Sequence, residues 1–242
     1  MVDINIGRHT SQQYNAELEA IRGKVLKMGG LVEEQLGNAL TAIVDGDSQL
    51  GEAVMTNDFK INALEVEIDE ECNKILVRRQ PAATDLRFII AVIKTITDLE
   101  RMGDEAERVG RMAVQLAERE RPKNQYGEIR HLGEMVKRVV HDSLDAFART
   151  DVEAAIRTRE QDVEIDSEYE SIMRQLITFM MEDPRQIPRT LAVMWSVRAL
   201  ERIADRACNI CEYVIYLVKG RDVRHTSWEK VQQELGLGKA KQ

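Results

Sequence analysis

The sequence predicts an all-α protein made of two tandem antiparallel three-helix bundles related by pseudo-twofold symmetry. The 242 residues are 43% hydrophobic but only 5% aromatic, with four prolines. This composition favours helices packed through aliphatic side chains over a turn-rich β-sandwich. Apolar residues recur at steps of three and four, which is the period of a helix. The second half of the chain then repeats the pattern of the first.

The first half is expected to contain three helices. A stripe of apolar residues indicates the first, which ends near residues 45–47. The stripe consists of Leu18, Ile21, Val25, Met28, Val32 and Leu36. The second helix runs over about 49–77 and stops ahead of Pro81, because proline is excluded from helix interiors. The third starts near Asp85 and fades before residues 121–127, the predicted linker between domains.

The second half is expected to repeat this arrangement. Its first helix covers about 129–148 and is followed by a break at 149–151. The next helix runs to about Met181, and residues 182–188, which include two prolines, interrupt it. The last helix then continues to about Val218.

Matched segments support a duplication of one three-helix unit. The segments align at offsets of 104, 104, 103 and 101 residues: 40–47 with 144–151, 58–62 with 162–166, Pro81 with Pro184, and 99–106 with 200–207. An offset that drifts only near the loops is typical of an internal repeat. We therefore expect a first repeat over 1–121, a second over 126–220, and a polar C-terminal tail over 221–242.

Composition also limits the function. A net charge of −8 and a pI near 5.2 argue against nucleic acid as the main partner, because phosphate binding needs a basic face. Three cysteines, Cys72, Cys208 and Cys211, do not form a disulfide framework and favour a reducing cytosol. No long apolar segment opens the chain, and no apolar run approaches the roughly 20 residues that span a bilayer. We expect a cytosolic protein without a signal peptide.

Two pairs of carboxylates are the candidate functional residues. Glu100 and Asp104, like Glu201 and Asp205, are four residues apart, so each pair projects from one face of a helix. At about 100° per residue, both pairs fall on the apolar side of their helices. A carboxylate directed at an apolar stripe needs a compensating cation or hydrogen bonds. Two carboxylates at this spacing are suited to chelating a hard metal ion.

The preceding helix of each repeat offers a similar arrangement. Asp58 and Asn62 are four apart in the first repeat, and Asp162 and Asp166 are four apart in the second. If the two helices pack antiparallel, each bundle gathers four oxygen-bearing side chains at one place. The sequence therefore predicts one metal site, for a single ion or a small cluster, in each bundle.

Structural alternatives stay open at this point. The acidic side chains are solvated, or they form ion pairs with arginines on neighbouring turns. The arginines concerned are Arg101, Arg108, Arg202 and Arg206. Cys208 and Cys211 are interpreted as buried packing residues rather than zinc ligands, because no second cysteine pair exists. No Ser-His-Asp or Cys-His grouping is apparent, so no catalytic residues are expected.

Several motifs are shared with a known family. They are Arg78-Arg-Gln-Pro-Ala-Ala-Thr-Asp-Leu-Arg87, Leu99-Glu-Arg-Met-Gly-Asp104, Leu200-Glu-Arg-Ile-Ala-Asp205, Phe179-Met-Met-Glu-Asp-Pro184 and Asn209-Ile-Cys-Glu-Tyr213. With these motifs the chain resembles the PhoU family of bacterial phosphate-transport accessory proteins. Its opening, Asn15-Ala-Glu-Leu-Glu19 and Met28-Gly-Gly-Leu-Val-Glu33, resembles the proteobacterial members in particular. The resemblance extends from about His9 to His225.

The resemblance implies a regulator with no catalysis of its own. PhoU-like proteins keep the phosphate-starvation response switched off when phosphate is plentiful. They are thought to link the ATPase subunit of the Pst phosphate transporter to the membrane histidine kinase PhoR, through its PAS domain. A cytoplasmic homodimer, peripherally associated with inner-membrane partners, is the implied state. Neither nucleic-acid binding nor direct membrane insertion is expected.

The resemblance also implies a metal cofactor. The family's acidic pairs are its metal-binding motif, for divalent or trivalent ions among iron, zinc, manganese and magnesium. The pairs carry over to Glu100, Asp104, Glu201 and Asp205, and the positions on the preceding helices to Asp58, Asn62, Asp162 and Asp166. The two copies of the motif differ at two positions. The second repeat has Ala204 where the first has Gly103, and the first repeat has Arg108 where the second has the family's asparagine, Asn209. The alternative function is a carboxylate–metal enzyme acting on phosphorylated compounds.

Overall fold

The computed structural model describes residues 12–118, 126–224, 226 and 230–231, and it is all-α over this part of the chain. The described elements are α1 (Gln12–Asp45), α2 (Ser48–Asn57), α3 (Phe59–Arg79), α4 (Ala83–Ala117), α5 (Gly127–Arg149), α6 (Val152–Glu160), α7 (Asp162–Glu182), the 3₁₀-helix η1 (Pro184–Gln186) and α8 (Ile187–Lys219). The predicted fold class is confirmed. None of the described helices is long and apolar enough to cross a membrane.

The two predicted middle helices are each broken in two, which the sequence analysis missed. Asp58 separates α2 from α3, and Gln161 separates α6 from α7. Both breaks follow a short helix that is capped by an aspartate. Asp47 accepts a hydrogen bond from the Leu50 amide at 2.9 Å, and Asp151 accepts one from the Ala154 amide at 3.0 Å. The capped short helices therefore recur at the same place in both repeats.

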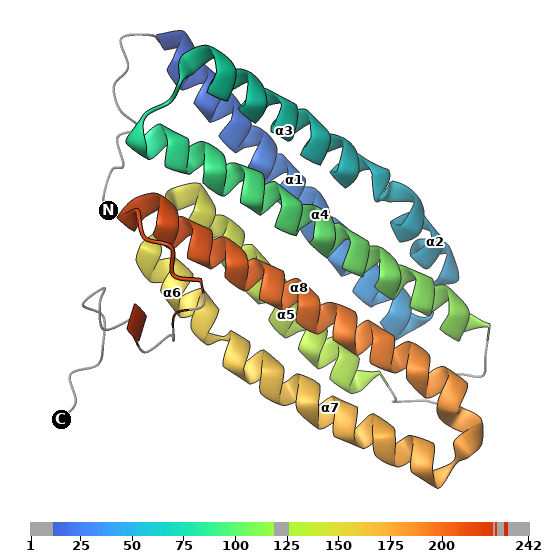
Figure 1. Cartoon of the computed structure of the whole chain (residues 1–242). Coiled ribbons are helices and arrows are strands. Elements are labelled where there is room, and N and C mark those ends of the chain that lie inside the picture. The colour runs from blue at the N-terminus through green and yellow to red at the C-terminus, as the bar shows by residue number, and fades with distance from the viewer. Residues whose placement is uncertain (1–11, 119–125, 225, 227–229, 232–242) are drawn as a thin grey trace, which may run out of the picture.

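The long helices α4 and α8 lie side by side at the centre of the molecule and run antiparallel (Figure 1). Almost every apolar side chain on their facing sides is buried, in one hydrophobic core that both repeats share. The interface holds two buried carboxylates of α4. Glu105 pairs with Arg202 of α8 at 2.9 Å, and the more deeply buried of the two is Asp98. It accepts hydrogen bonds from the Tyr213 hydroxyl at 2.7 Å and from Arg206 at 3.4 Å. A buried carboxylate needs such partners, because an unpaired charge in a core is strongly destabilising.

A reciprocal contact between α1 and α5 shows the pseudo-twofold relation. A methyl group added at Gly29 would lie 2.7 Å from Cδ2 of Leu144, and one added at Gly133 would overlap Cδ2 of Leu40. The glycines are 104 residues apart, as are the leucines. Each leucine of one repeat therefore fills the space left by the glycine of the other.

The segments between and after the repeats are described only in part. The predicted linker at 121–127 falls largely on residues 119–125, which lie outside the described residues. The predicted tail is partly packed, because Val223 and Val231 are buried together with Ile156 and Ile215 in a small second cluster. The part of the tail beyond residue 231 also lies outside the described residues.

We predict that Gly51→Val destabilises the protein. A Cβ at Gly51 on α2 would lie 2.9 Å from the carbonyl oxygen of Gly110 on α4, and a backbone atom cannot rotate away. Overpacking of this kind costs roughly 1–3 kcal/mol. Gly23→Ala is the control: nothing lies within 4 Å of its added Cβ, and it should stabilise by up to about 1 kcal/mol. Urea denaturation measures both, and an unchanged midpoint for Gly51→Val would contradict the prediction.

Candidate metal centre

The predicted acidic residues lie where α3 packs against α4 in the first repeat and where α7 packs against α8 in the second. Their burial differs from the prediction. Glu100 and Glu201 are half-buried, whereas Asp104 and Asp205 reach solvent. The pairs are therefore not directed into the apolar core. They lie at its edge, where the contacts of α3 with α4 and of α7 with α8 meet solvent.

Asp58 is the most buried member of the first set and is held by neutral hydrogen-bond donors. It is 6% exposed. Gln35 on α1 donates to its Oδ1 at 2.9 Å, and Asn62 donates to its Oδ2 at 3.0 Å. Gly103 on α4 permits the close approach, because an added Cβ would lie 2.9 Å from the same Oδ1. The side-chain donors to the Asp58 carboxylate among the described residues are thus uncharged.

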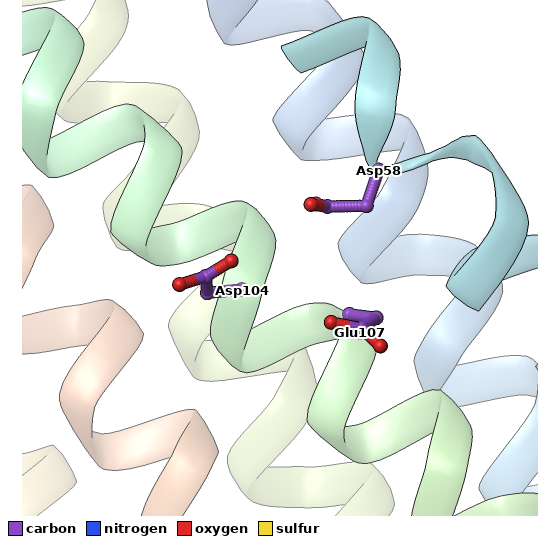
Figure 2. A group of neighbouring side chains, drawn as sticks. All are labelled: Asp58, Asp104 and Glu107. Atoms are coloured by element: carbon purple, nitrogen blue, oxygen red, sulfur yellow. The ribbon is translucent and has the colours of Figure 1, made fainter. Parts of the chain in front are cut away.

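Three carboxylates converge in the first repeat. Single oxygens of Asp58, Asp104 and Glu107 all lie within 4.8 Å of one another. Figure 2 shows Asp58 at the junction of α2 and α3, with Asp104 and Glu107 on α4. Glu107, which also pairs with Arg111 at 2.5 Å, was missed by the sequence analysis. Its spacing of three residues from Asp104 was an available signal, since side chains at that spacing are neighbours on a helix.

Mutual repulsion acts on this group. Burial raises the pKa of Glu100, and the nearby carboxylates of Asp104, Glu65 and Asp58 raise it further. The partial burial of Asp104 likewise raises its pKa, although the side chain reaches solvent, and Asp58 and Glu107 raise it further. A site that gathers like charges in this way favours protonation or the binding of a cation.

In the second repeat, a positively charged side chain lies beside the buried aspartate. The buried Asp162, which corresponds to Asp58, accepts a hydrogen bond from Arg159 at 2.7 Å. The residue at the position of Arg159 in the first repeat is Met55, and Cys208 stands where the first repeat has Glu107. The Cys208 thiol is buried beside Asp162, and this burial raises its pKa. A guanidinium and a neutral thiol have thus replaced a methionine and a carboxylate.

The remaining predicted residues of the second repeat do share one electrostatic environment. Burial and then Asp205 raise the pKa of Glu201, while burial and then Asp162 and Asp166 raise that of Asp205. No three acidic, histidine or cysteine side chains of the described part of this repeat come as close together as those of the first. The two predicted sites are therefore similar in composition but not equivalent.

The arginines proposed as structural partners of the acidic pairs are mostly engaged elsewhere. Arg108 and Arg202 both pair with Glu105, at 3.0 and 2.9 Å. Arg206 pairs with Asp98 at 3.4 Å. These contacts weaken the interpretation in which the acidic pairs are neutralised by neighbouring turns.

Two buried side-chain oxygens of the predicted site residues are available to a hard cation. Oδ1 of Asn62 in the first repeat and Oε2 of Glu201 in the second are buried and have no hydrogen-bond partner in the part of the chain that the structure describes. Buried polar atoms are nearly always paired, so such atoms often mark the place of an ion or water. The oxygen ligands of the first set suit magnesium or manganese, whereas zinc and iron more often use nitrogen or sulfur ligands as well.

Comparison with known proteins identifies the family. The chain matches the sequence model of the PhoU domain over residues 25–113 and again over 129–214. The chain belongs to the PhoU family. The two matches correspond to the two repeats described above.

Its relatives carry consistent names. The chain is 51% identical over 231 residues to the "Phosphate-specific transport system accessory protein PhoU homolog" of Pseudomonas putida, covering 96% of this chain and 90% of the relative. It is 44% identical over 236 residues to the corresponding PhoU protein of Escherichia coli (strain K12), covering 97% of both chains. These are names of accessory proteins rather than of enzymes. They confirm the expectation of a protein without catalysis of its own and do not support the alternative of a carboxylate–metal enzyme.

Solved structures of the family share the fold. The crystal structure of PhoU from Pseudomonas aeruginosa superposes with a TM-score of 0.84 at 51% identity, covering 86% of this chain and 100% of that one. The phosphate transport system regulatory protein PhoU from Streptococcus pneumoniae gives a TM-score of 0.79 at 30% identity, covering 87% and 99%.

We predict that Asp104→Asn makes the metal-free protein more stable at pH 7. Because the folded protein raises the pKa of Asp104, it retains a proton that the unfolded chain has released. Stability is therefore lost as pH rises from the ordinary carboxyl range, about 4, through the raised value. Asp104→Asn has no carboxyl group to deprotonate at this position, so its stability does not fall with pH for this reason. Thermal unfolding in chelator at pH 4 and pH 7 should show the larger gain at pH 7.

The exposed Glu52 on α2 supplies the control for this measurement. Glu52→Gln should change the melting temperature equally little at both pH values. An Asp104→Asn gain that is larger at pH 4 than at pH 7 would contradict the account of repulsion among the carboxylates.

Proposed function

We propose that the protein is an accessory protein of a bacterial phosphate transport system and regulates phosphate uptake. The observation that carries this proposal is the match to named PhoU proteins over nearly the whole chain, at 51% identity for the Pseudomonas putida relative. The absence of a catalytic grouping from the predicted residues is consistent with a protein that acts by contact.

The finer proposal is an adaptor between two partners. One is the ATPase subunit of the Pst transporter and the other is the PAS domain of the histidine kinase PhoR, so that the kinase stays inactive when phosphate is plentiful. The protein would act in the cytoplasm, as a homodimer held peripherally at the inner membrane. The arrangement of the outer helices supports two contacts, since α2 and α3 lie on one side of the central pair and α7 on the other (Figure 1).

Metal ions are the proposed structural cofactor. In the first repeat, Asp58, Asp104 and Glu107 would hold the ion, with Glu100 and Asn62 beside them. In the second repeat the candidate ligands are Asp162, Asp166, Glu201 and Asp205. When bound, the ion neutralises carboxylates that otherwise repel one another, and it thereby ties the outer helix of each repeat to the central pair. Because Arg159 already supplies a positive charge at Asp162, we propose weaker binding in the second repeat.

We predict unequal metal loss from two matched variants. Glu100→Ala with Asp104→Ala should lower the manganese bound after equilibrium dialysis more than Glu201→Ala with Asp205→Ala does. Arg159→Met, which copies the residue of the first repeat, should strengthen binding at the second site, because a competing cation is removed. Metal content is measured by mass spectrometry and affinity by titration calorimetry. Unchanged metal content in both acidic-pair variants would refute the metal proposal.

We predict that deleting the gene derepresses phosphate-starvation genes in phosphate-rich medium. The intact gene and the Glu52→Gln control should restore repression, and the Glu100→Ala, Asp104→Ala variant should not. A reporter of a starvation promoter gives the measurement, and a pull-down with the PhoR cytoplasmic domain tests the contact directly. Normal repression in the deletion strain would overturn the regulatory role.

A further inference from the structure

The two repeats differ in the length of their first helix. At the offset of 104 residues, Gly127, where α5 begins, corresponds to Gly23 within α1. The turns of α1 from Gln12 to Arg22 therefore have no helical counterpart at the start of α5 among the described residues. Figure 1 shows α7 and α8 extending past the start of α5 at this end of the molecule.

In the first repeat, these extra turns of α1 cover the end of the bundle. Their apolar residues Tyr14, Leu18 and Ile21 are buried. Glu17 accepts hydrogen bonds from Arg79 at the end of α3, at 2.7 and 3.1 Å. The Tyr14 hydroxyl donates to Asp85 at the start of α4, at 3.3 Å. An amphipathic helix with apolar residues at i, i+4 and i+7 thus closes this end.

In the second repeat, the described residues leave a groove of about 310 Å³ at the same place, between α7 and α8, with Ile129 of α5 at one end. The apolar stripe of α3 and that of α7 can be compared residue by residue at the offset of 104. Ile68, Cys72 and Ile75 are 0%, 0% and 6% exposed. Ile172, Leu176 and Phe179 are 3%, 8% and 38% exposed. Exposure thus increases toward the end that α1 covers in the first repeat.

The charge at the rim of the groove is reversed between the repeats. Arg78 and Arg79 at the end of α3 correspond to Glu182 and Asp183 at the end of α7. Glu128 adds a third carboxylate to the lining. Asp183 pairs with Arg185 at 2.9 Å, which offsets part of this charge. The one cation of the lining among the described residues, Arg189, is buried and donates to the Tyr126 hydroxyl at 3.3 Å.

We propose that this groove, lined by Ile172, Leu176, Phe179 and Val193, binds a basic amphipathic helix of a partner protein. The helix lies as the first turns of α1 lie in the other repeat, with apolar residues at i, i+4 and i+7 over the α7 stripe. A basic residue takes the position of Glu17 and faces Asp183 and Glu182. The first turns of α1 from a second copy do not fit, because Glu17 is acidic. Helix-in-groove recognition of this kind is common in proteins.

The proposal rests on the geometry of the second repeat and not on the proposed function. It supplies the adaptor with one contact surface and the chemistry that surface recognises. Binding to this groove can therefore be tested without metal, kinase or transporter.

Two matched peptides provide the test. Both carry residues 12–24 of this chain, held helical by a lactam bridge between positions 12 and 16, which face solvent on α1. One keeps Glu17 and the other carries Glu17→Lys. By fluorescence anisotropy at low salt, the full-length protein should bind the lysine peptide more tightly, by roughly fivefold or more. The lysine gains an exposed ion pair with the rim, and the repulsion between Glu17 and the rim is lost.

Variants of the protein make the test specific. Glu182→Arg with Asp183→Arg copies the first repeat and should reverse the preference between the peptides. Phe179→Asp should abolish binding of the lysine peptide, while Val163→Asp, at an exposed apolar site on the far end of α7, should not change it.

Three results would overturn the proposal. The first is binding of neither peptide, which would show that the groove does not accept such a helix. The second is equal binding of both peptides. The third is a change of oligomeric state on Phe179→Asp in light scattering, which would make the groove an interface between two copies.

Discussion

The antiparallel pairing of α4 and α8 is the interaction on which the rest of the structure depends. Each helix is buried on the side that faces the other repeat, so neither three-helix unit has a complete core of its own. The pairing holds a buried carboxylate, Asp98, whose hydrogen-bond donors among the described residues all come from the other repeat, chiefly Tyr213 at 2.7 Å. Since an unpaired buried charge is strongly destabilising, this contact also fixes the register of the two helices. The outer helices of each repeat then pack against the remaining sides of α4 and α8.

The two repeats share one scaffold but differ in the electrostatics of the acidic residues between their outer and central helices. Asp58 lies at the break between α2 and α3, its counterpart Asp162 is the first residue of α7 directly after the break at Gln161, and both are buried. Gln35 and Asn62 hold the first carboxylate with neutral donors, whereas Arg159 holds the second with a charge. A neutral donor orients a carboxylate and leaves its charge available to a cation, while a guanidinium compensates that charge. Similar folds in the two repeats therefore do not imply similar sites.

The length of one helix has a comparable effect on the surface. In the first repeat the early turns of α1 complete the packing, and Ile75 is buried. In the second repeat α5 starts later, and the corresponding Phe179 is partly exposed beside a groove. The rim of that groove carries Glu182 and Asp183 in place of two arginines. A difference in helix length together with a reversal of charge can turn a core contact into a recognition surface, because apolar burial and charge complementarity are then left to a partner.

The sequence by itself determined the helical class, the duplication and the acidic pairs, because helix period, proline positions and repeat offsets are properties of neighbouring residues. The structure was needed for the breaks at Asp58 and Gln161, since the hydrogen bond from Gln35 to Asp58 joins residues far apart in the chain. It was also needed to show that Asp104 lies at the rim of the core and that Glu107 completes the first carboxylate group. A helical projection gives the direction of a side chain on its own helix. How closely the next helix approaches that face depends on packing, which only the tertiary structure decides.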